Sequence, residues 1–283
     1  MIKGGIMGFI FGTSGIPLRC KGDTSEGIEC ANSLGLGAFE MGFVQGVRMK
    51  EDTAAKVGDV ARKQNIAISV HAPYYINLLS EENEKKVASR SRIFESARIG
   101  GIASAKRIVF HPAFYGKMDR KLAIAGMIDQ VGMILEEMKA KKIEGPILAP
   151  ECMGKIAQFG TINENFTIAQ EFGMEKVNPC VDFGHLHARE NGKLKTKKDF
   201  LEKLDEIEAF SKKYLQSMHI HFEGIEFSEK GERRHLPISS KSPDFDLLAE
   251  ALIEKNCSGT IISESPEIEN DALEMQRIYS RLK

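Results

Sequence analysis

The sequence has 283 residues, of which 42% are hydrophobic and 28% charged, so it is long enough to bury a full-sized core. Its 39 Lys and Arg residues nearly balance its 40 Asp and Glu residues, giving a formal net charge of -1. This removes the simplest argument for nucleic-acid binding, a strongly basic chain, but excludes neither a local basic patch nor a site whose positive charge comes from metal ions.

Short segments rich in apolar and β-branched residues recur along the chain, and longer segments with helical periodicity separate them. Several of the short segments are almost continuously apolar, as expected for parallel strands covered on both faces. The predicted strands are 7–12, 38–43, 66–71, 107–111, 146–151, 177–182, 217–222 and 260–264.

The longer segments carry apolar residues at three- and four-residue spacing, which predicts helices with one buried face. The clearest are 84–103, 120–141, 200–214, 244–255 and 267–282. Thr24 or Ser25 could cap a first helix, and Asp119 could cap the second of these five.

Eight β/α repeats without a linker rich in Pro, Gly or Ser predict a single (β/α)8 TIM barrel over residues 1–283, in which residues 1–6 could form a flexible tail. A doubly wound open sheet fits less well. Its Gly-rich loop should follow the first strand, whereas Gly35–Gly37 precedes a strand.

The five cysteines are scattered and include no Cys-x-x-Cys pair. Their spacing favours neither a disulfide scaffold nor a four-cysteine zinc site, and a reducing, cytoplasmic setting fits better. No apolar run approaches the roughly 18 residues needed to span a bilayer. We therefore expect a cytoplasmic protein without a membrane contact, and the sequence implies no protein partner.

Six of the predicted strands end on a side chain that binds metals well. In a parallel barrel all carboxyl ends lie on one face, so residues far apart in sequence gather into a ring. Burying several carboxylates together costs several kcal/mol unless cations compensate, and a mixture of imidazole and carboxylate suits Zn, Mn or Fe. The residues are His71, His111, Glu151, Asp182, His219 or His221, and Glu264.

Further histidines lie near this ring in the predicted fold. His185 follows Asp182 by three residues, and His235 lies in the segment after the seventh strand. His219 and His221 are two residues apart, so both side chains point to the same side of a strand and could face the barrel mouth. The sequence therefore predicts a polynuclear metal site.

At these residues the chain resembles the endonuclease IV family of apurinic/apyrimidinic endonucleases, within the wider xylose-isomerase-like barrel group. The resemblance runs from Ala38 to Pro266, and its most specific match is HAPYYINL at 71–78. The other matches, in the family's order, are FHP at 110–112, PEC at 150–152, VDFGHLHARENG at 181–192, MHIH at 218–221, RRHLPI at 233–238 and SESP at 263–266.

That family uses a trinuclear zinc site to cut DNA on the 5′ side of an abasic sugar during DNA repair. The resemblance implies duplex DNA with abasic sites as the substrate and two or three Zn²⁺ as cofactors, with Mn²⁺ as an alternative. The implied ligands are His71, His111 and a bridging Glu151 for the first metal, Asp182, His219 and Glu264 for the second, and His185 and His235 for the third.

The sequence departs from the family at Arg233, where the family has an Asp ligand two residues before the last His. A cation at this position removes one ligand. The third metal is then either weakly held or absent, or it is bound with the help of His187, His221 or Glu232.

The resemblance also implies roles in DNA binding and catalysis. Tyr74, with Tyr75 beside it, resembles the residue that probes the gap at an abasic site; packing under a loop is the alternative. Arg48 resembles the arginine inserted into the base stack, and Arg233 would lie near the DNA. Glu151 would fix the metal spacing, and Glu264 would orient the attacking hydroxide.

The main alternative is a sugar or sugar-phosphate isomerase or epimerase with one divalent metal. Its Glu-Asp-His-Glu set would be Glu151, Asp182, His219 and Glu264, with the two glutamates transferring protons. Such an enzyme has no need of the four further histidines, which favours the nuclease. A barrel without catalytic activity, acting as a binding module, would not need so dense a set of ligands.

Overall fold

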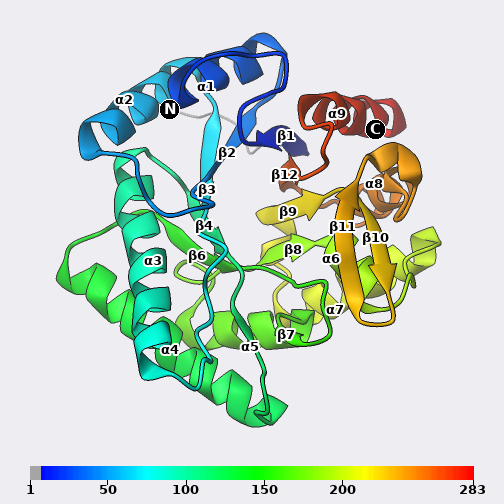
Figure 1. Ribbon diagram of the computed structural model, residues 1–283. Helices are drawn as coiled ribbons and strands as arrows, with labels where there is room; N and C mark the ends of the chain where they lie inside the picture. Colours follow the sequence, from blue (N-terminus) through cyan, green and yellow to red (C-terminus); the bar gives the residue numbers. More distant parts are fainter. Residues whose placement is uncertain (1–7) are drawn as a thin grey trace.

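The computed structural model describes residues 8–283 (Figure 1). Eight parallel strands follow one another in the order β6-β4-β3-β2-β1-β12-β9-β8, and two single bridges, Leu148 to Val177 and Glu151 to Cys180, nearly close the ring between β6 and β8. The strands are β1 Phe9–Ser14, β2 Ala38–Gly42, β3 Ala67–His71, β4 Arg107–Phe110, β6 Ile147–Pro150, β8 Cys180–Asp182, β9 Met218–Phe222 and β12 Gly259–Ser263. This is the predicted TIM barrel.

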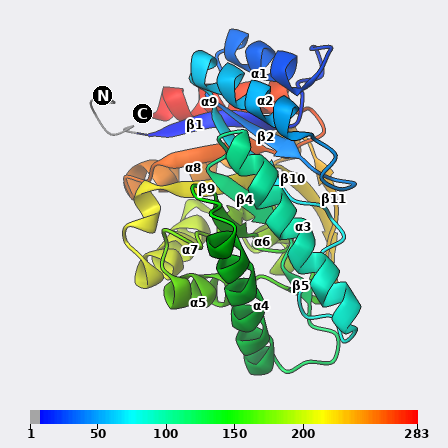
Figure 2. The ribbon, with the colours of Figure 1, turned by 90° about the vertical axis from the view of Figure 1, so that its left-hand side faces the viewer.

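All eight predicted strands are confirmed, each within three residues of its expected bounds. The predicted tail, residues 1–6, lies outside the described residues. Two short antiparallel pairs were not predicted: β5 Ala113–Phe114 with β7 Gln158–Phe159, and β10 Gly224–Ser228 with β11 Gly231–Leu236. The β10–β11 hairpin follows β9 directly and lies at the carboxyl end of the barrel strands (Figure 2).

Helices surround the barrel and cover the outer face of the sheet (Figures 1 and 2). They are α1 Thr24–Ser33, α2 Glu51–Gln64, α3 Asn83–Ile102, α4 Arg120–Ala140, α5 Ile162–Phe172, α6 Phe183–Arg189, α7 Lys197–Phe210, α8 Phe245–Glu254 and α9 Glu269–Leu282. Short 3-10 turns lie at Tyr214–Gln216 and Ile238–Ser240.

The helix caps follow the sequence with one correction. Asp119 caps α4 as predicted, accepting the Lys121 N–H at 2.8 Å. The cap of α1 is Asp23, one residue before the predicted pair, because its N–H donates to the Glu26 carboxylate while its own side chain accepts the Glu26 N–H, which completes a capping box. A Thr or Ser one position later would leave that reciprocal bond unmade.

The barrel interior differs from the apolar layer between sheet and helices. Val109, Ala149 and Cys180 form a small apolar cluster of their own. Glu40 on β2 reaches His219 on β9, on the other side of β1 and β12 in the sheet order, so these buried polar side chains also lie inside the barrel. Barrel interiors are commonly filled by bulky branched residues. Here a polar layer takes their place.

The cysteines differ from expectation in one respect. Cys20 and Cys30 form a disulfide, which the sequence analysis did not predict, and it ties the loop before α1 to that helix. In the described part of the chain Cys152, Cys180 and Cys257 are free and buried. Among residues 8–283 no helix is long and apolar enough to cross a membrane.

Candidate metal centre

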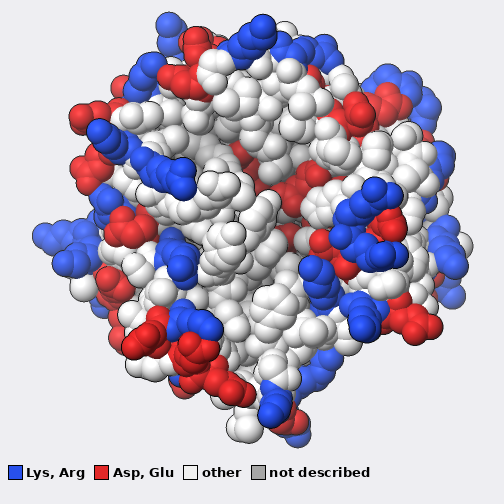
Figure 3. Space-filling model, in the orientation of Figure 1, with Lys and Arg blue, Asp and Glu red and all other residues white. Residues whose placement is uncertain are grey.

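The carboxyl ends of the barrel strands bring the predicted ligands to one face. His71 ends β3, Asp182 ends β8, and Glu151 and Glu264 directly follow β6 and β12. Figure 3 shows a hollow in this face with carboxylates on its floor, and Lys and Arg side chains beside it over β10 and β11. The ring expected from the sequence is present as a cluster of side chains.

Glu151 is the centre of the first ligand group. Its Oε2 lies 3.2 Å from His71 Nε2 and 3.2 Å from His111 Nε2. His71 Nδ1 donates to the carbonyl oxygen of Ala72 at 2.8 Å, which leaves Nε2 facing the carboxylate. Ligand atoms of His71, His111 and Glu151 lie within 4.8 Å of one another, a spacing that could hold a metal ion.

A second group shares Glu151 and adds Asp182, His221 and Glu264, again with ligand atoms within 4.8 Å. His221 Nδ1 lies 3.6 Å from both Glu151 Oε1 and Glu264 Oε1. Glu151 Oε1, Asp182 Oδ2 and His221 Nδ1 are buried and have no hydrogen-bond partner in residues 8–283. Three carboxylates, two of them with unpaired buried oxygens, call for a cation.

His219, the residue expected in this second group, lies elsewhere. Its Nε2 is 3.0 Å from Glu40 Oε2 inside the barrel, and His221, two residues further along β9, is the histidine beside Glu151 and Glu264. The sequence showed that both point to the same side of the strand. Which one reaches the ring depends on the stagger of β9 against its neighbours, which spacing does not give.

A third group joins α6 to the β10–β11 hairpin. Ligand atoms of His185, Glu223 and His235 lie within 4.8 Å of one another. Asp182 caps α6 by accepting the His185 N–H at 2.7 Å, so the cap that starts the helix also positions this histidine. Glu232 Oε2 lies 3.5 Å from His185 Nε2, and Glu232 Oε1 lies 3.9 Å from His235 Nε2.

Arg233 does not face this group. The pairing of Glu226 with Arg234 and of Phe227 with Glu232 leaves Arg233 as the extra residue of a β-bulge. Arg233 and Arg234 both form ion pairs with Glu226, at 3.5 and 2.5 Å. Of the three substitutes considered from the sequence, Glu232 lies beside His185 and His235.

The other two substitutes lie elsewhere. His187 packs against Phe227, with ring centroids 5.3 Å apart, and its Nε2 is 3.5 Å from Ser242 Oγ. His221 belongs to the second group.

Two buried carboxylates near the ligand groups, Glu223 and Glu40, were not among the predicted site residues. Glu223 has both oxygens buried without a hydrogen-bond partner in the described chain, and burial together with the charge of Asp182 raises its pKa well above the ordinary value. It directly follows β9, as Glu151 follows β6, so the same rule could have found it. Glu40 lies in the middle of β2, where that rule gives no signal.

The electrostatics around Glu151 favour a charged carboxylate beside a charged His71 imidazole. Burial alone would lower the pKa of His71, but Glu151, Glu264 and Glu40 outweigh it and raise that pKa to about 9. Burial likewise opposes the charge of Glu151, yet the neighbouring histidines hold its pKa well below the ordinary value.

The tyrosines of the HAPYY segment are exposed near this ring. Tyr74 is 54% exposed and Tyr75 73%, so neither packs under a loop. The Tyr74 ring lies against His71 and His111, with centroids 5.6 and 5.5 Å away. Arg48 is exposed in the loop after β2, where its Nη2 lies 3.5 Å from Gln45 Oε1.

Arg189, on α6, braces the loop that carries Glu151. Its Nη1 donates to the carbonyl oxygens of Met153, Lys155 and Gln158 at 3.1, 2.7 and 3.0 Å. Its Nη2 lies 3.2 Å from Tyr115 Oη. The helix that carries His185 is thereby tied to the segment that follows Glu151.

The sequence comparisons agree with this architecture. The family model for xylose isomerase-like TIM barrels matches residues 28–282. The chain belongs to this family. An uncharacterized protein of Methanocaldococcus jannaschii is 36% identical over 274 residues, which are 96% of this chain and 97% of that protein.

Solved structures of different activities share the fold of this family member. Endonuclease IV from Thermus thermophilus is similar with a TM-score of 0.71 at 15% identity, covering 95% of this chain and 98% of that one. A D-tagatose 3-epimerase-like protein is similar with a TM-score of 0.72 at 17% identity, covering 97% of each chain. At such identities the likeness shows the fold alone, so the activity must be argued from the site.

Proposed function

We propose that this protein is a metal-dependent phosphodiesterase of the endonuclease IV type, which hydrolyses DNA on the 5′ side of abasic sites. One observation carries the proposal. Glu151 belongs to two ligand groups at once, one completed by His71 and His111 and the other by Asp182, His221 and Glu264. A single tetrahedral Zn²⁺ ion takes four ligands, fewer than the six side chains present, whereas two neighbouring ions can share a bridging carboxylate.

The donor chemistry fits Zn²⁺, with Mn²⁺ as the alternative. The first ion would be held by His71, His111 and Glu151, and the second by Glu151, Asp182, His221 and Glu264. A third would be held by His185, Glu232 and His235, with Glu223 beside them. When bound, such ions polarise a phosphodiester, lower the pKa of a bound water and stabilise the leaving 3′ oxygen.

The chain's own residues would position the reactants. The Glu264 side chain is 13% exposed, so it can be reached from the hollow, and Ser14 Oγ donates to its Oε1 at 3.3 Å. Glu264 would orient the attacking water or hydroxide. Glu151 is fully buried and fixes the positions of the imidazoles around it.

The surface around the hollow fits a nucleic acid with a missing base. Tyr74 and Tyr75 would stack in the gap, since exposed aromatic rings beside a cationic site bind unpaired nucleotides well. Arg48 would enter the base stack and Arg233 would contact phosphates. Two or three bound Zn²⁺ ions would add about four to six positive charges, so the net charge of -1 is no obstacle.

An epimerase remains the competing function because Glu151, Asp182, His221 and Glu264 form a complete mononuclear set on their own. Glu151 and Glu264 both face His221 Nδ1 at 3.6 Å, and two carboxylates could transfer protons to and from a sugar. This function leaves His71, His111, His185 and His235 without a role.

The test combines elemental analysis with a nicking assay on a duplex that carries a tetrahydrofuran abasic analogue. We expect at least two Zn²⁺ per chain and a nick that leaves a 3′-hydroxyl, with an undamaged duplex of the same sequence left intact. Glu264→Gln should abolish nicking and leave the circular dichroism spectrum unchanged. One metal per chain, no nicking and turnover of a ketohexose would identify the epimerase instead.

A further inference from the structure

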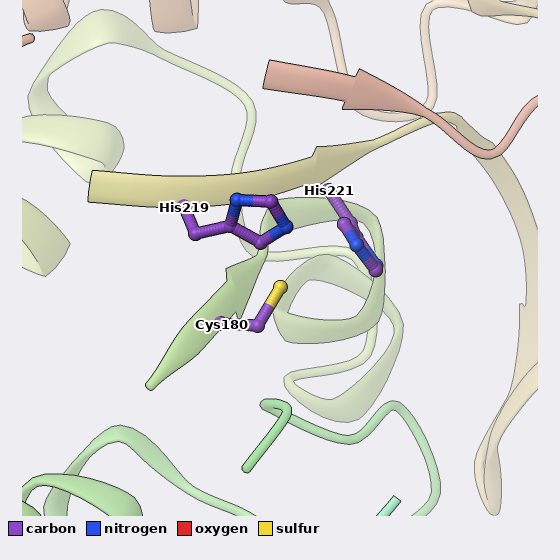
Figure 4. A group of neighbouring side chains, drawn as sticks. All are labelled: Cys180, His219 and His221. Carbon is purple, nitrogen blue, oxygen red and sulfur yellow. The ribbon is translucent and has the colours of Figure 1, made fainter. Parts of the chain in front are cut away.

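A different group of metal-binding side chains lies deeper in the barrel. Cys180 on β8 and His219 and His221 on β9 have ligand atoms within 4.8 Å of one another (Figure 4). Cys180 pairs in register with His219, and all three side chains are buried, at 0%, 2% and 0% exposure. Figure 4 shows the sulfur directed toward the two imidazole rings.

Glu40 approaches the two histidines of this group from β2. Its Oε2 lies 3.0 Å from His219 Nε2, and its Oε1 lies 2.9 Å from His221 Nε2. Ser69 Oγ donates to Glu40 Oε2 at 2.7 Å, which holds the carboxylate in place. The carboxylate thus lies against both imidazoles of the Cys180, His219 and His221 group.

The second of these contacts is not a hydrogen bond. Glu40 Oε1 and His221 Nε2 are 2.9 Å apart, but neither atom has a hydrogen-bond partner anywhere in residues 8–283. The His221 imidazole is therefore not aligned to donate to that oxygen. Both atoms are buried, and buried polar atoms without partners are costly. Two metal-binding atoms that lie this close without a hydrogen bond between them have the arrangement expected of ligands to one cation.

The chemistry of the four side chains indicates the kind of cation. Thiolate and imidazole favour borderline and soft metals, above all Zn²⁺, for which Cys180, His219 and His221 supply three of the usual four ligands. Of the ligand groups found in the described chain, this is the one that contains sulfur. Mg²⁺ and Ca²⁺, which prefer oxygen, fit poorly.

We propose that Cys180, His219 and His221, with Glu40 against both imidazoles, form a further, buried metal site for Zn²⁺ beneath the ring, with which it shares His221. On binding, the Cys180 thiol proton and the proton on His221 Nε2 leave to solvent, the Nε2 proton of the His219 imidazole moves to its Nδ1, and the carboxylate is already ionised. His221 presents Nε2 to this site and Nδ1 to the ring, so with both ions bound it would bridge them as an imidazolate, its second proton also leaving to solvent. The proposal does not depend on the reaction that the ring catalyses.

Burial makes this site one that is filled during folding, so the test uses full-length protein produced in cobalt-supplemented cells. Co²⁺ substitutes for Zn²⁺, and a Co²⁺–thiolate bond gives a charge-transfer band in the near-ultraviolet that nitrogen and oxygen ligands do not give. Wild-type protein should show this band. Cys180→Ser should lose it together with one metal ion per chain, whereas Cys257→Ser, which changes a buried thiol of the main apolar core that belongs to no ligand group found in residues 8–283, should retain both.

Absence of the band from cobalt-loaded wild type, or its survival in Cys180→Ser, would overturn the proposal. If Cys180→Ser does not fold, His219→Gln keeps the thiol and removes one ligand. Its band should shift or weaken with the loss of one metal ion per chain, and an unchanged spectrum and metal content would refute the site. Because no DNA is present, these results are separate from the nicking assay: an intact band without nicking contradicts the nuclease alone.

Discussion

Glu232 Oε2 lies 3.5 Å from His185 Nε2, on the same side of the hairpin as His235. Two arginines separate Glu232 from His235 on β11. Residues three apart on a regular strand point to opposite faces. The bulge places Arg233 and Arg234 together opposite Glu226, so Glu232 and His235 return to the same face. One inserted residue therefore leaves a carboxylate where the resemblance seemed to put a cation.

The first prediction concerns this bulge. Glu232→Ala should lower the metal content by one ion per chain and weaken nicking at least about tenfold, because the third ion would lose one of its ligands and keep only His185, His235 and the neighbouring Glu223. Deleting Arg233 should leave the metal content unchanged, since Glu232 and His235 would then be two residues apart on one face. Elemental analysis of both variants checks this. If the Arg233 deletion loses a metal ion and Glu232→Ala does not, Glu232 is not a ligand of the third ion.

The second prediction concerns the exposed tyrosine beside the ring. Tyr74→Ala should weaken binding to an abasic duplex by about tenfold or more, since stacking on an aromatic ring contributes about 1–3 kcal/mol per base. Metal content and melting temperature should stay near wild type because the side chain is 54% exposed. Fluorescence anisotropy with abasic and undamaged duplexes measures the effect. An equal loss of affinity for both duplexes would mean that Tyr74 does not read the lesion.

The third prediction concerns metal removal. Stripping the ring with a chelator should lower the melting temperature by several degrees, because ions bound to the folded state alone stabilise it by mass action and the unpaired oxygens of Glu151 and Asp182 remain buried. Added Zn²⁺ should restore the original value. The shift should be smaller in Glu151→Gln, which lacks the shared ligand charge. A melting temperature that is unaffected after metal loss is verified would contradict the assignment of the ring.

The fourth prediction concerns pH and a carboxylate outside the ring. Glu164 accepts hydrogen bonds from Tyr115 Oη at 2.6 Å and from the Gly160 and Thr161 N–H groups at 3.0 and 2.9 Å. Burial favours its neutral form, but these bonds outweigh burial and hold its pKa below the ordinary 4.5. Its stabilisation is therefore present above pH 4.5 and is lost as the pH falls through the lower folded-state pKa.

Glu164→Gln should accordingly cost about 1–3 kcal/mol of unfolding free energy at pH 7, and the difference from wild type should shrink below about pH 4. Urea titrations at several pH values measure both effects. Glu171→Gln, an exposed change on the same helix, serves as the control and should be neutral. A Glu164→Gln penalty that stays constant down to about pH 3 would rule out the charge as its cause.

Much of the fold was predictable because strand and helix periods are local properties of the sequence. The ring was predictable too, since the carboxyl ends of parallel strands lie on one face whatever the details of packing. His71, His111, Glu151 and Glu264 needed no more information than that.

The rest depends on relations between distant segments. Whether His219 or His221 reaches the ring is set by the stagger of β9, and the contact of Glu40 with His219 exists because the sheet curves round on itself. The bulge at Arg233 is a property of strand pairing, not of one strand. Cys20 and Cys30 meet because the chain turns into α1 between them, and spacing alone does not announce that turn.

The bonds of Arg189 have a consequence for how readily the ring can take up ions. These hydrogen bonds join the segment after Glu151 to α6, which carries His185. The distance between the Glu151 segment and α6 is therefore fixed before any ion binds. Two segments that are already held in position lose little conformational entropy when an ion binds between them, so more of the gross binding energy is retained as affinity. Selectivity among metal ions would then come from the fixed distances between the ligands on these two segments, which an ion must match because the segments do not move to fit it.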